Sequence, residues 1–273
     1  MNTPETAWPS ENTDLAATVI PAPESLQPWL TELGRIPAVR ERSEPFAHLP
    51  QATTMIVLRT EDNGPPDALV LGARTKASYA EAAKPLGCLR LQLAAGVTSA
   101  LLGVRAVDLT DRVVRLADLP GPAASLAAEL TELRPDELFP YLEQRLPQRV
   151  RESPTQRSHR GLLHRAVDTV STQPAERRVP VLANSLAVSE RQLRNLFIAG
   201  IRVSPKHYAR IERVRRVLTR AGSSPWSQLA VRTGYYDHSH MTAEFRALMG
   251  VTPSSFIDGG RPLGDPCRPL PRG

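Results

Sequence analysis

Cysteines, aromatic residues and long apolar runs are all scarce in this chain of 273 residues. The only two cysteines are Cys88 and Cys267, and the second lies in a Pro- and Arg-rich segment, so we expect no structural disulfide and a reducing compartment. No stretch reaches the roughly 18 apolar residues that would span a bilayer. The first 20 residues lack a basic segment followed by an apolar run, so the sequence predicts no secretory signal. Together these absences predict a cytoplasmic protein without a membrane partner.

A combination of side chains that would hold a metal is also lacking. His238 and His240 in the segment DHSH come nearest, but residues at i and i+2 on a helix point about 200° apart. No cysteine or acidic cluster nearby completes a zinc site. Cys88 fits a buried strand better than a reactive thiol sensor. We therefore expect neither a metal nor another cofactor.

Acidic residues are scarce in the second half of the chain. Residues 155–260 contain 7 acidic and 16 basic residues, whereas residues 1–154 contain 20 acidic and 15 basic ones. A basic half joined to an acidic half indicates that the C-terminal part meets a polyanion. A solvated basic surface without a partner explains the charge alone equally well.

The hydrophobic pattern divides the chain into two folded parts between two ends without fixed structure. The ends are residues 1–25 and 261–273, and the folded parts are residues 26–152 and 153–260, joined near a polar segment at 151–158. In the first part the turn-forming cluster EDNGPP predicts a hairpin, and Pro135 is expected in the first turn of a helix. The expected strands are 53–60, 67–75, 88–95 and 112–116, and the expected helices are 97–104 and two between 118 and 150.

The second folded part reads as helix almost throughout and contains a repeat. FIAGIRVSPKHY at 197–208 and FRALMGVTPSSF at 245–256 share Phe, Ala, Val and Pro at a constant offset of 48. The main mismatch is Arg202, which stands where the second copy has Gly250. Glycine takes a left-handed conformation freely, whereas Arg202 would be strained there by about 1 kcal/mol, unless its turn differs.

The first copy has the pattern of a helix–turn–helix unit. Ser189 is placed to cap a helix in which Leu193, Leu196 and Phe197 point inward. Arginine can pair with guanine, and Gln or Asn with adenine, although the same residues also suit a merely solvated helix. The outward candidates for DNA contact are Glu190, Arg191, Gln192, Arg194 and Asn195.

The second copy repeats this pattern with different side chains. Asp237 takes the capping position, and Met241 and Phe245 point inward. At least one of the two histidines is also suited to packing within the turn. The outward candidates are Asp237, His238, Ser239, His240 and Thr242.

A long amphipathic helix is expected between the copies, at 204–222. At about 1.5 Å per residue it spans roughly 25–27 Å, against about 34 Å between successive major grooves on one face of DNA. Two recognition helices held in this way could enter neighbouring grooves. The candidate phosphate contacts are Lys206, Arg210, Arg213 and Arg246.

Residues 157–258 resemble the DNA-binding domain of AraC-type transcriptional regulators. The resemblance lies in LANSLAVSERQLRNLF, VSPKHYARIERVRRVL and GYYDHSHMTAEFRALMGVTPSSF. It implies seven helices in two helix–turn–helix subdomains bridged by the long helix. It also implies base contacts by the outward residues of both reading helices, including Ala243. That position is often Arg in the family, so the second helix is expected to contribute less base readout.

The N-terminal half resembles, more weakly, the cupin-like β-barrel or sandwich domain of these regulators. The resemblance thus implies an α+β chain that senses an effector or dimerises through one half and binds double-stranded DNA through the other. Further candidate partners are RNA polymerase, a small-molecule effector and a second copy of the chain. His48 is the only histidine of the N-terminal half, so we expect no metalloenzyme. Two alternatives remain, a member that binds protein instead of DNA and an enzymatic N-terminal half.

Overall fold

A computed structural model describes residues 18–36, 46–60, 66–80, 87–134, 136–172 and 179–259. Its N-terminal half contains a six-stranded antiparallel sheet in the order β1-β2-β7-β4-β5-β8 and a separate two-stranded ribbon of β3 and β6. The strands are β1 (Thr18–Pro21), β2 (Leu30–Ile36), β3 (Phe46–His48), β4 (Met55–Thr60), β5 (Asp67–Leu71), β6 (Ser78–Ala80), β7 (Gly87–Leu93) and β8 (Val113–Arg115).

The hairpin predicted around EDNGPP is confirmed, because β4 pairs with β5 from Met55 opposite Leu71 to Arg59 opposite Asp67. Successive side chains of a strand point to opposite faces of a sheet. Accordingly, Ile56 packs with the large core of the N-terminal half, whereas Met55 belongs to a smaller cluster. The alternating strand 88–95 is β7, which lies between β2 and β4.

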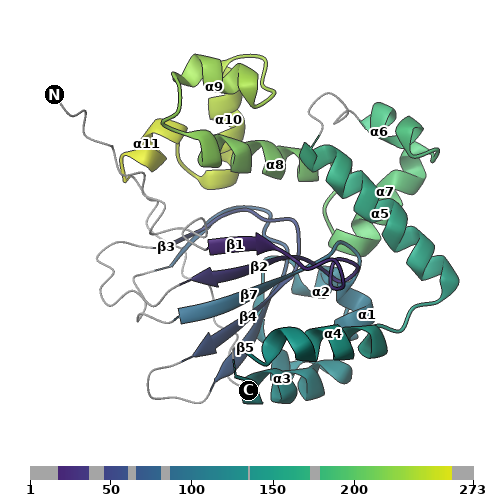
Figure 1. The fold of residues 1–273 in the computed structure, drawn as a ribbon. Helices are drawn as coiled ribbons and strands as arrows, with labels where there is room; N and C mark the ends of the chain where they lie inside the picture. Colours follow the sequence, from purple (N-terminus) through teal and green to yellow (C-terminus); the bar gives the residue numbers. More distant parts are fainter. Residues whose placement is uncertain are drawn as a thin grey trace.

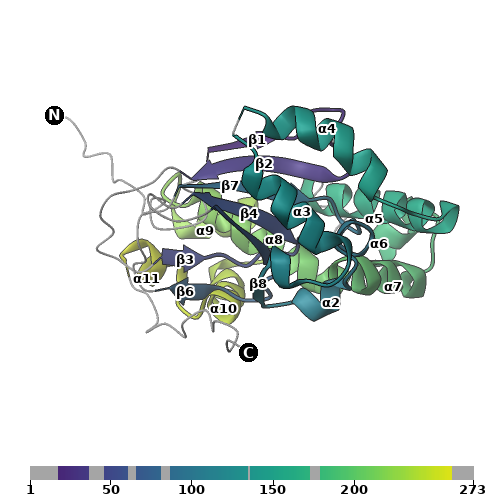
Figure 2. The same cartoon turned by 90° about the horizontal axis from the view of Figure 1, so that it is seen from below.

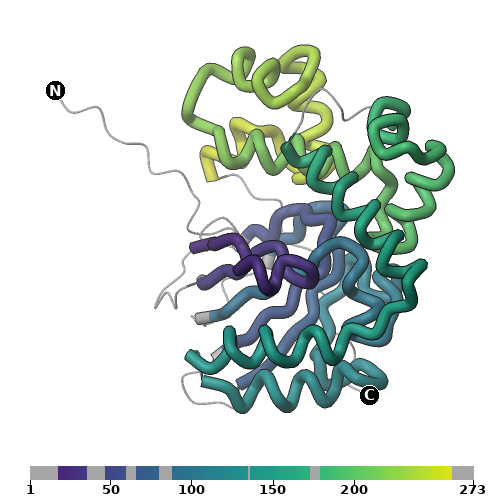
Figure 3. Tube along the Cα trace, turned by 45° about the vertical axis from the view of Figure 1, so that its right-hand side comes forward, coloured from purple at the N-terminus to yellow at the C-terminus, as the bar shows by residue number. Residues whose placement is uncertain are grey.

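Helices cover one face of this sheet. Leucines of α3 and α4, among them Leu126 and Leu142, pack with Val70 and Leu91 of the strands. Figures 1 and 3 show α3 and α4 on one side of the sheet and α8 to α11 on the other. The helices of this half are α1 (Thr98–Leu102), α2 (Ala106–Leu109), the 3₁₀-helix η3 (Leu116–Asp118), α3 (Pro122–Glu132) and α4 (Leu138–Arg149).

The C-terminal half is all helical, which confirms the α+β expectation for the whole chain. The apolar stripe of α5 buries Leu163, Ala166 and Val170. Seven helices follow one another here among the described residues: α5 (Pro154–Thr172), α6 (Val179–Ser185), α7 (Glu190–Ile201), α8 (Pro205–Arg220), α9 (Trp226–Arg232), α10 (His238–Met249) and α11 (Pro253–Ile257).

The two halves share a core. Leu49 and Tyr79 of the N-terminal half belong to the same buried cluster as Phe197, Ile211 and Phe245 of the C-terminal helices. Hydrogen bonds also cross between the halves, from Arg215 Nη1 to the carbonyl of Pro50 at 3.2 Å and from Arg160 Nη1 to that of Pro28 at 2.7 Å. The reading units are therefore packed against the sheet domain.

One expectation about the chain ends is wrong. Residues 1–25 were expected to lack fixed structure, but β1 begins at Thr18 and pairs with β2, and Ala22 is buried. Short apolar residues among prolines gave no clear strand pattern, so only the pairing with β2 defines this strand. Residues 1–17 and 261–273 lie outside the described residues, as does Pro135.

Candidate nucleic-acid interface

The first helix–turn–helix unit consists of α6, a tight turn and α7. Ser189 Oγ accepts a hydrogen bond from Gln192 N at 3.1 Å, and Gln192 Oε1 accepts one from Ser189 N, also at 3.1 Å. This reciprocal pair is a capping box, which satisfies otherwise unpaired N–H groups at the start of the helix. Leu193 and Phe197 are buried, as predicted, and Leu196 is half-buried. Because its inward face packs in the core, α7 exposes its outer face to solvent.

The second unit, α9 to α10, has the same construction. Asp237 Oδ1 accepts from His240 N at 2.7 Å, so the predicted cap is present. Met241 and Phe245 are buried, and Phe245 meets Phe256 edge to face with ring centroids 6.1 Å apart. Figure 2 shows α7 and α10 on the same side of the molecule, toward its two ends.

The second turn is one residue longer than the first. Val188 N bonds to Ala183 O, and Tyr235 N bonds to Ala230 O, an equivalence at an offset of 47 rather than 48. The additional residue before the cap is Tyr236, whose side chain is 89% exposed. Sequence reasoning missed this residue, although the change of offset within the repeat is a signal that identifies it.

The ends of the two reading helices have matching backbone geometry. Arg202 has φ 67° and ψ −6°, and Gly250 has φ 78° and ψ −16°, so both are left-handed. The alternative of a different first turn is therefore wrong. Arg202 instead tolerates the strained conformation, and its side chain is exposed. Ser204 and Thr252 then cap α8 and α11 in the same way, with Pro205 and Pro253 as first helical residues.

The predicted residues of α7 all lie on its exposed face. Glu190 lies in the first turn of α7, where the negative charge of a carboxylate interacts favourably with the helix dipole. Gln192 uses its side-chain oxygen in the capping box. Its amide N–H groups are therefore the donors that remain for contact with another molecule. The base-contact role of Arg191, Arg194 and Asn195 stays a prediction.

The predicted residues of α10 mostly line one shallow groove. The groove is formed by His238, Ser239, Thr242, Ala243, Arg246, Ala247 and Thr252. Thr242 Oγ1 lies 3.3 Å from His238 Nε2. His240 instead packs its ring edge to face against Tyr235, with centroids 5.3 Å apart, which is the packing role that one histidine was expected to take. Their contacts with bases remain predictions.

Two of the four predicted phosphate contacts are engaged inside the domain. Arg210 Nε donates to Glu244 Oε2 at 3.1 Å, and Arg213 donates through Nε and Nη2 to both oxygens of Glu244 at 2.9 and 2.8 Å. The Glu244 side chain is only 7% exposed. Arg213 also lies over the ring of Tyr235, 5.2 Å from its centroid. Lys206 and Arg246 are exposed and fit the predicted role better.

Sequence reasoning missed Glu244 because it looked for outward residues. An acidic residue directly before the buried Phe245, within the apolar stripe of α10, is a signal of a buried ion pair. Its partners lie on α8, so this pair fixes α10 on the bridging helix. Burial is the first cause that raises the pKa of Tyr235 above its ordinary value, and the nearby carboxylate of Glu244 adds to it.

His207 on α8 is half-buried, and a hydrogen bond with the backbone of Thr75 connects it to the N-terminal half. Burial, and after it the charge of Arg210, lowers the pKa of His207 below its ordinary value. Within the described residues, no group of three or more His, Cys, Asp or Glu side chains is arranged to hold a metal ion. In the same part of the chain, no helix combines the length and apolarity that crossing a membrane requires.

One family model and several solved structures are similar to this chain. Residues 182–258 match the family model described as a helix-turn-helix domain. ToxT from Vibrio cholerae is similar in outline, with a TM-score of 0.40 and 12% identity over 83% of this chain and 97% of that one. ToxT from Vibrio cholerae O395 bound to (E)-4-(8-methylnaphthalen-1-yl)but-3-enoic acid gives 0.42 and 11% over 83% and 97%. Among curated protein sequences, none matches the chain.

The family match covers both capped helices, both left-handed ends and the bridging helix α8. Paired units of this kind, each with an exposed second helix, are the structural basis of DNA reading in helix–turn–helix proteins. Residues 182–258 of the chain therefore form a helix–turn–helix domain with the paired construction of DNA-binding units.

Proposed function

We propose that the chain is a one-component regulator in which residues 153–260 read adjacent major grooves and residues 26–152 control that binding. The observation that carries this proposal is the placement of α7 and α10 on one side of the molecule (Figure 2). The 16 residues of α8 hold the two units apart by about 24 Å along its axis. Successive major grooves are about 34 Å apart on one face of DNA, so a bridge of this length with one unit at each of its ends suits two neighbouring grooves.

The residues divide by role. Arg191, Arg194 and Asn195 on α7 would contact base edges through donors that match guanine and adenine. His238, Ser239 and Thr242, with Ala243, would do so on α10. Lys206 and Arg246 would contact phosphates and so set register rather than sequence.

The N-terminal half would act through its contacts with the reading units. It packs on them through a shared core, so a change in this half can reach the DNA-binding surface. We assign to it the response to a small-molecule effector and pairing with a second copy, and RNA polymerase is a candidate partner of the DNA-bound chain. DNA binding implies that the protein works in the cytoplasm, at the nucleoid.

The test is a binding selection from random DNA with the full chain, followed by titration of the selected site and of its single-base variants. Arg194→Ala should cost about 1–3 kcal/mol and relax the choice at one base pair. Arg165→Ala, an exposed arginine on α5, is the matched control and should leave the choice unchanged. Binding should also weaken steeply with salt, because phosphate contacts release counterions.

Two results would contradict the proposal. An equal loss on every DNA sequence for Arg194→Ala would remove its base-reading role. Failure of the full chain to select any DNA would favour a member that acts through protein contacts or through an enzymatic N-terminal half.

A further inference from the structure

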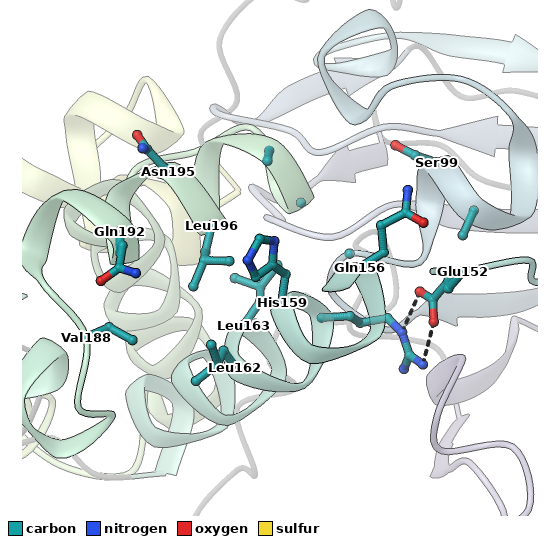
Figure 4. Close-up of a pocket in the computed structure, with 15 residues that line it drawn as sticks. Ser99, Glu152, Gln156, His159, Leu162, Leu163, Val188, Gln192, Asn195 and Leu196 are labelled. Carbon is teal, nitrogen blue, oxygen red and sulfur yellow. Dashed lines mark hydrogen bonds and ion pairs between the residues drawn. The ribbon is translucent and has the colours of Figure 1, made fainter. Parts of the chain in front are cut away.

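A pocket of about 550 Å³ lies where the N-terminal half meets the first reading unit (Figure 4). Its walls come from residues 96–100 of the N-terminal half, from residues 152–163 at the start of α5, and from residues 188–200 of α7 and the turn before it. Small-molecule sites in proteins have volumes of about 300–1,000 Å³. Base reading by the outer face of α7 does not account for a cavity at this joint.

Most of the lining surface is apolar. Leu162 and Leu163 on α5 face Leu196 and Ala199 on α7, and Ala100 lies on the side of the N-terminal half. Figure 4 shows side chains of α5 and α7 turned toward the same space. Such walls favour a ligand with an apolar body, because burying apolar surface is the main favourable contribution to binding.

The two charged side chains of the lining are already paired with each other. Arg160 donates through Nε and Nη2 to the two oxygens of Glu152 at 2.8 and 2.9 Å, and through Nη1 to the carbonyl of Pro28 at 2.7 Å. The side chains of Arg160 and Glu152 are 16% and 5% exposed. An ionic ligand would place an unpaired charge beside this neutral pair, and burial of an unpaired charge is strongly unfavourable.

The remaining polar side chains of the lining are those of Ser99, Gln156, His159, Gln192 and Asn195, and none of them is a carboxylate, ammonium or guanidinium group. This set suits an uncharged ligand that forms hydrogen bonds. Gln156 Oε1 accepts from Ser153 N at 2.8 Å, and Gln192 Oε1 accepts from Ser189 N, so each of these side chains directs its oxygen to a helix cap. Their amide N–H groups remain as donors. Asn195, also in the lining, adds a further amide. These donors match carbonyl-type acceptors on a ligand.

We propose that this pocket binds an uncharged small molecule with an apolar body and carbonyl-type acceptors, and that the bound molecule competes with DNA. The competition rests on the proposed function, since Gln192 and Asn195 belong both to the pocket and to the exposed face of α7. The end of α7 is pressed against the N-terminal half, because a Cβ at Gly200 would lie 3.3 Å from Gly96 Cα. A ligand therefore fits beside α7 rather than beyond its end, next to the base-reading residues.

The test uses Nile red, an uncharged apolar dye with a carbonyl group, and the full-length protein. Dye fluorescence should rise on binding, and the selected DNA should displace the dye, whereas random DNA should do so only at higher concentration. Ala199→Trp and Ala100→Trp fill the pocket from opposite walls, and each should weaken dye binding by about tenfold or more. Ala128→Trp, at an exposed position of α3, is the matched control and should leave dye binding unchanged. Circular dichroism melting checks that each variant is folded.

A comparison of an anionic dye with Nile red tests the chemical class of the ligand. The anionic dye 1-anilinonaphthalene-8-sulfonate should bind about tenfold more weakly than Nile red. Equal or tighter binding of the anion would overturn the class, and dye binding that survives both folded Trp variants would overturn the site. Dye that stays bound in saturating selected DNA would overturn the competition. If no DNA is selected at all, the proposed function fails, while dye binding and its loss in the Trp variants are still measured.

Discussion

The hydroxyl of Tyr79 donates a hydrogen bond of 2.5 Å to the carbonyl oxygen of Met249, 170 positions further along the chain. Two residues before Tyr79, the N–H of Ala77 donates to the carbonyl of Leu248 at 2.8 Å. Both carbonyls belong to the last turn of α10, where helix carbonyls have no partner within the helix. The N-terminal half thus supplies donors to two carbonyls at the end of the second reading helix.

Removal of the Tyr79 hydroxyl should loosen this contact. Tyr79→Phe keeps the buried ring but leaves the Met249 carbonyl without this donor, so the free energy of unfolding should fall by about 0.5–1.5 kcal/mol. Urea unfolding measures the fall, and hydrogen exchange should show faster exchange at the end of α10. Tyr236→Phe is the control, since that residue is 89% exposed. Equal stability of the two variants would show that the hydrogen bond contributes nothing.

Glu244 should stabilise the second unit by holding two arginines. Glu244→Gln leaves Arg210 and Arg213 close together without their shared carboxylate, and loss of one partner of a buried pair is costly. Because the two arginine side chains are 31% and 19% exposed, solvent reduces the cost to about 1–3 kcal/mol. Thermal or urea unfolding provides the measurement, with Glu132→Gln on the exposed surface of α3 as the control. A loss as small as that of the control would remove Glu244 from this role.

Stability should depend on pH through His207. The pKa of this imidazole is lowered first by burial and then by Arg210, while Thr75, Asp111 and Glu244 act in the opposite direction. The unfolded chain, with an ordinary pKa of about 6.5, binds the proton more readily than the folded one. Stability is therefore full above about pH 6.5 and is lost as the pH falls toward the lower folded value.

The measurement is urea unfolding between pH 5 and 8 for the natural chain and for His207→Gln. The variant does not titrate at this position, so its stability should fall less on acidification. His159→Gln, at an exposed position of α5, should retain the full dependence. Parallel pH profiles for the natural chain and His207→Gln would contradict the assignment.

A substitution of Arg202, the left-handed residue at the end of α7, should make the protein more stable. Arg202→Gly removes the Cβ contact that costs about 1 kcal/mol in this conformation, so the free energy of unfolding should rise by about 0.5–1 kcal/mol. Gly250→Ala, at the equivalent place, should lower it by about 1 kcal/mol. Arg202→Ala retains a Cβ and serves as the control for the lost side chain. A gain in Arg202→Ala as large as in Arg202→Gly would attribute the effect to the side chain instead of the backbone.

Local signals predicted the reading units well. Ser189 and Asp237 before apolar stripes identified the starts of α7 and α10, and the cluster EDNGPP identified the hairpin of β4 and β5. These features depend on residues a few positions apart, whose hydrogen bonds and packing are set by the local chain. The amphipathic pattern of residues 204–222 likewise identified α8.

Features that depend on distant partners could not be predicted. The strand β6 is three residues long, and its pairing with β3 brings Tyr79 to α10. Periodicity placed Arg210 and Arg213 on one face of α8, but a helix face does not reveal whether its neighbour is a phosphate or Glu244. Three-dimensional packing decides between these partners, and it also creates the pocket between α5 and α7.

The matching ends at Arg202 and Gly250 have a consequence for how such a protein can change. The backbone takes the same left-handed conformation at the ends of both reading helices, even where arginine makes that conformation unfavourable. This conformation therefore does not depend on the outward side chains. If the outward residues read bases, as proposed, substitutions there alter which DNA is recognised while the scaffold stays the same. The two helices can diverge independently, each becoming a separate determinant of half of the target site.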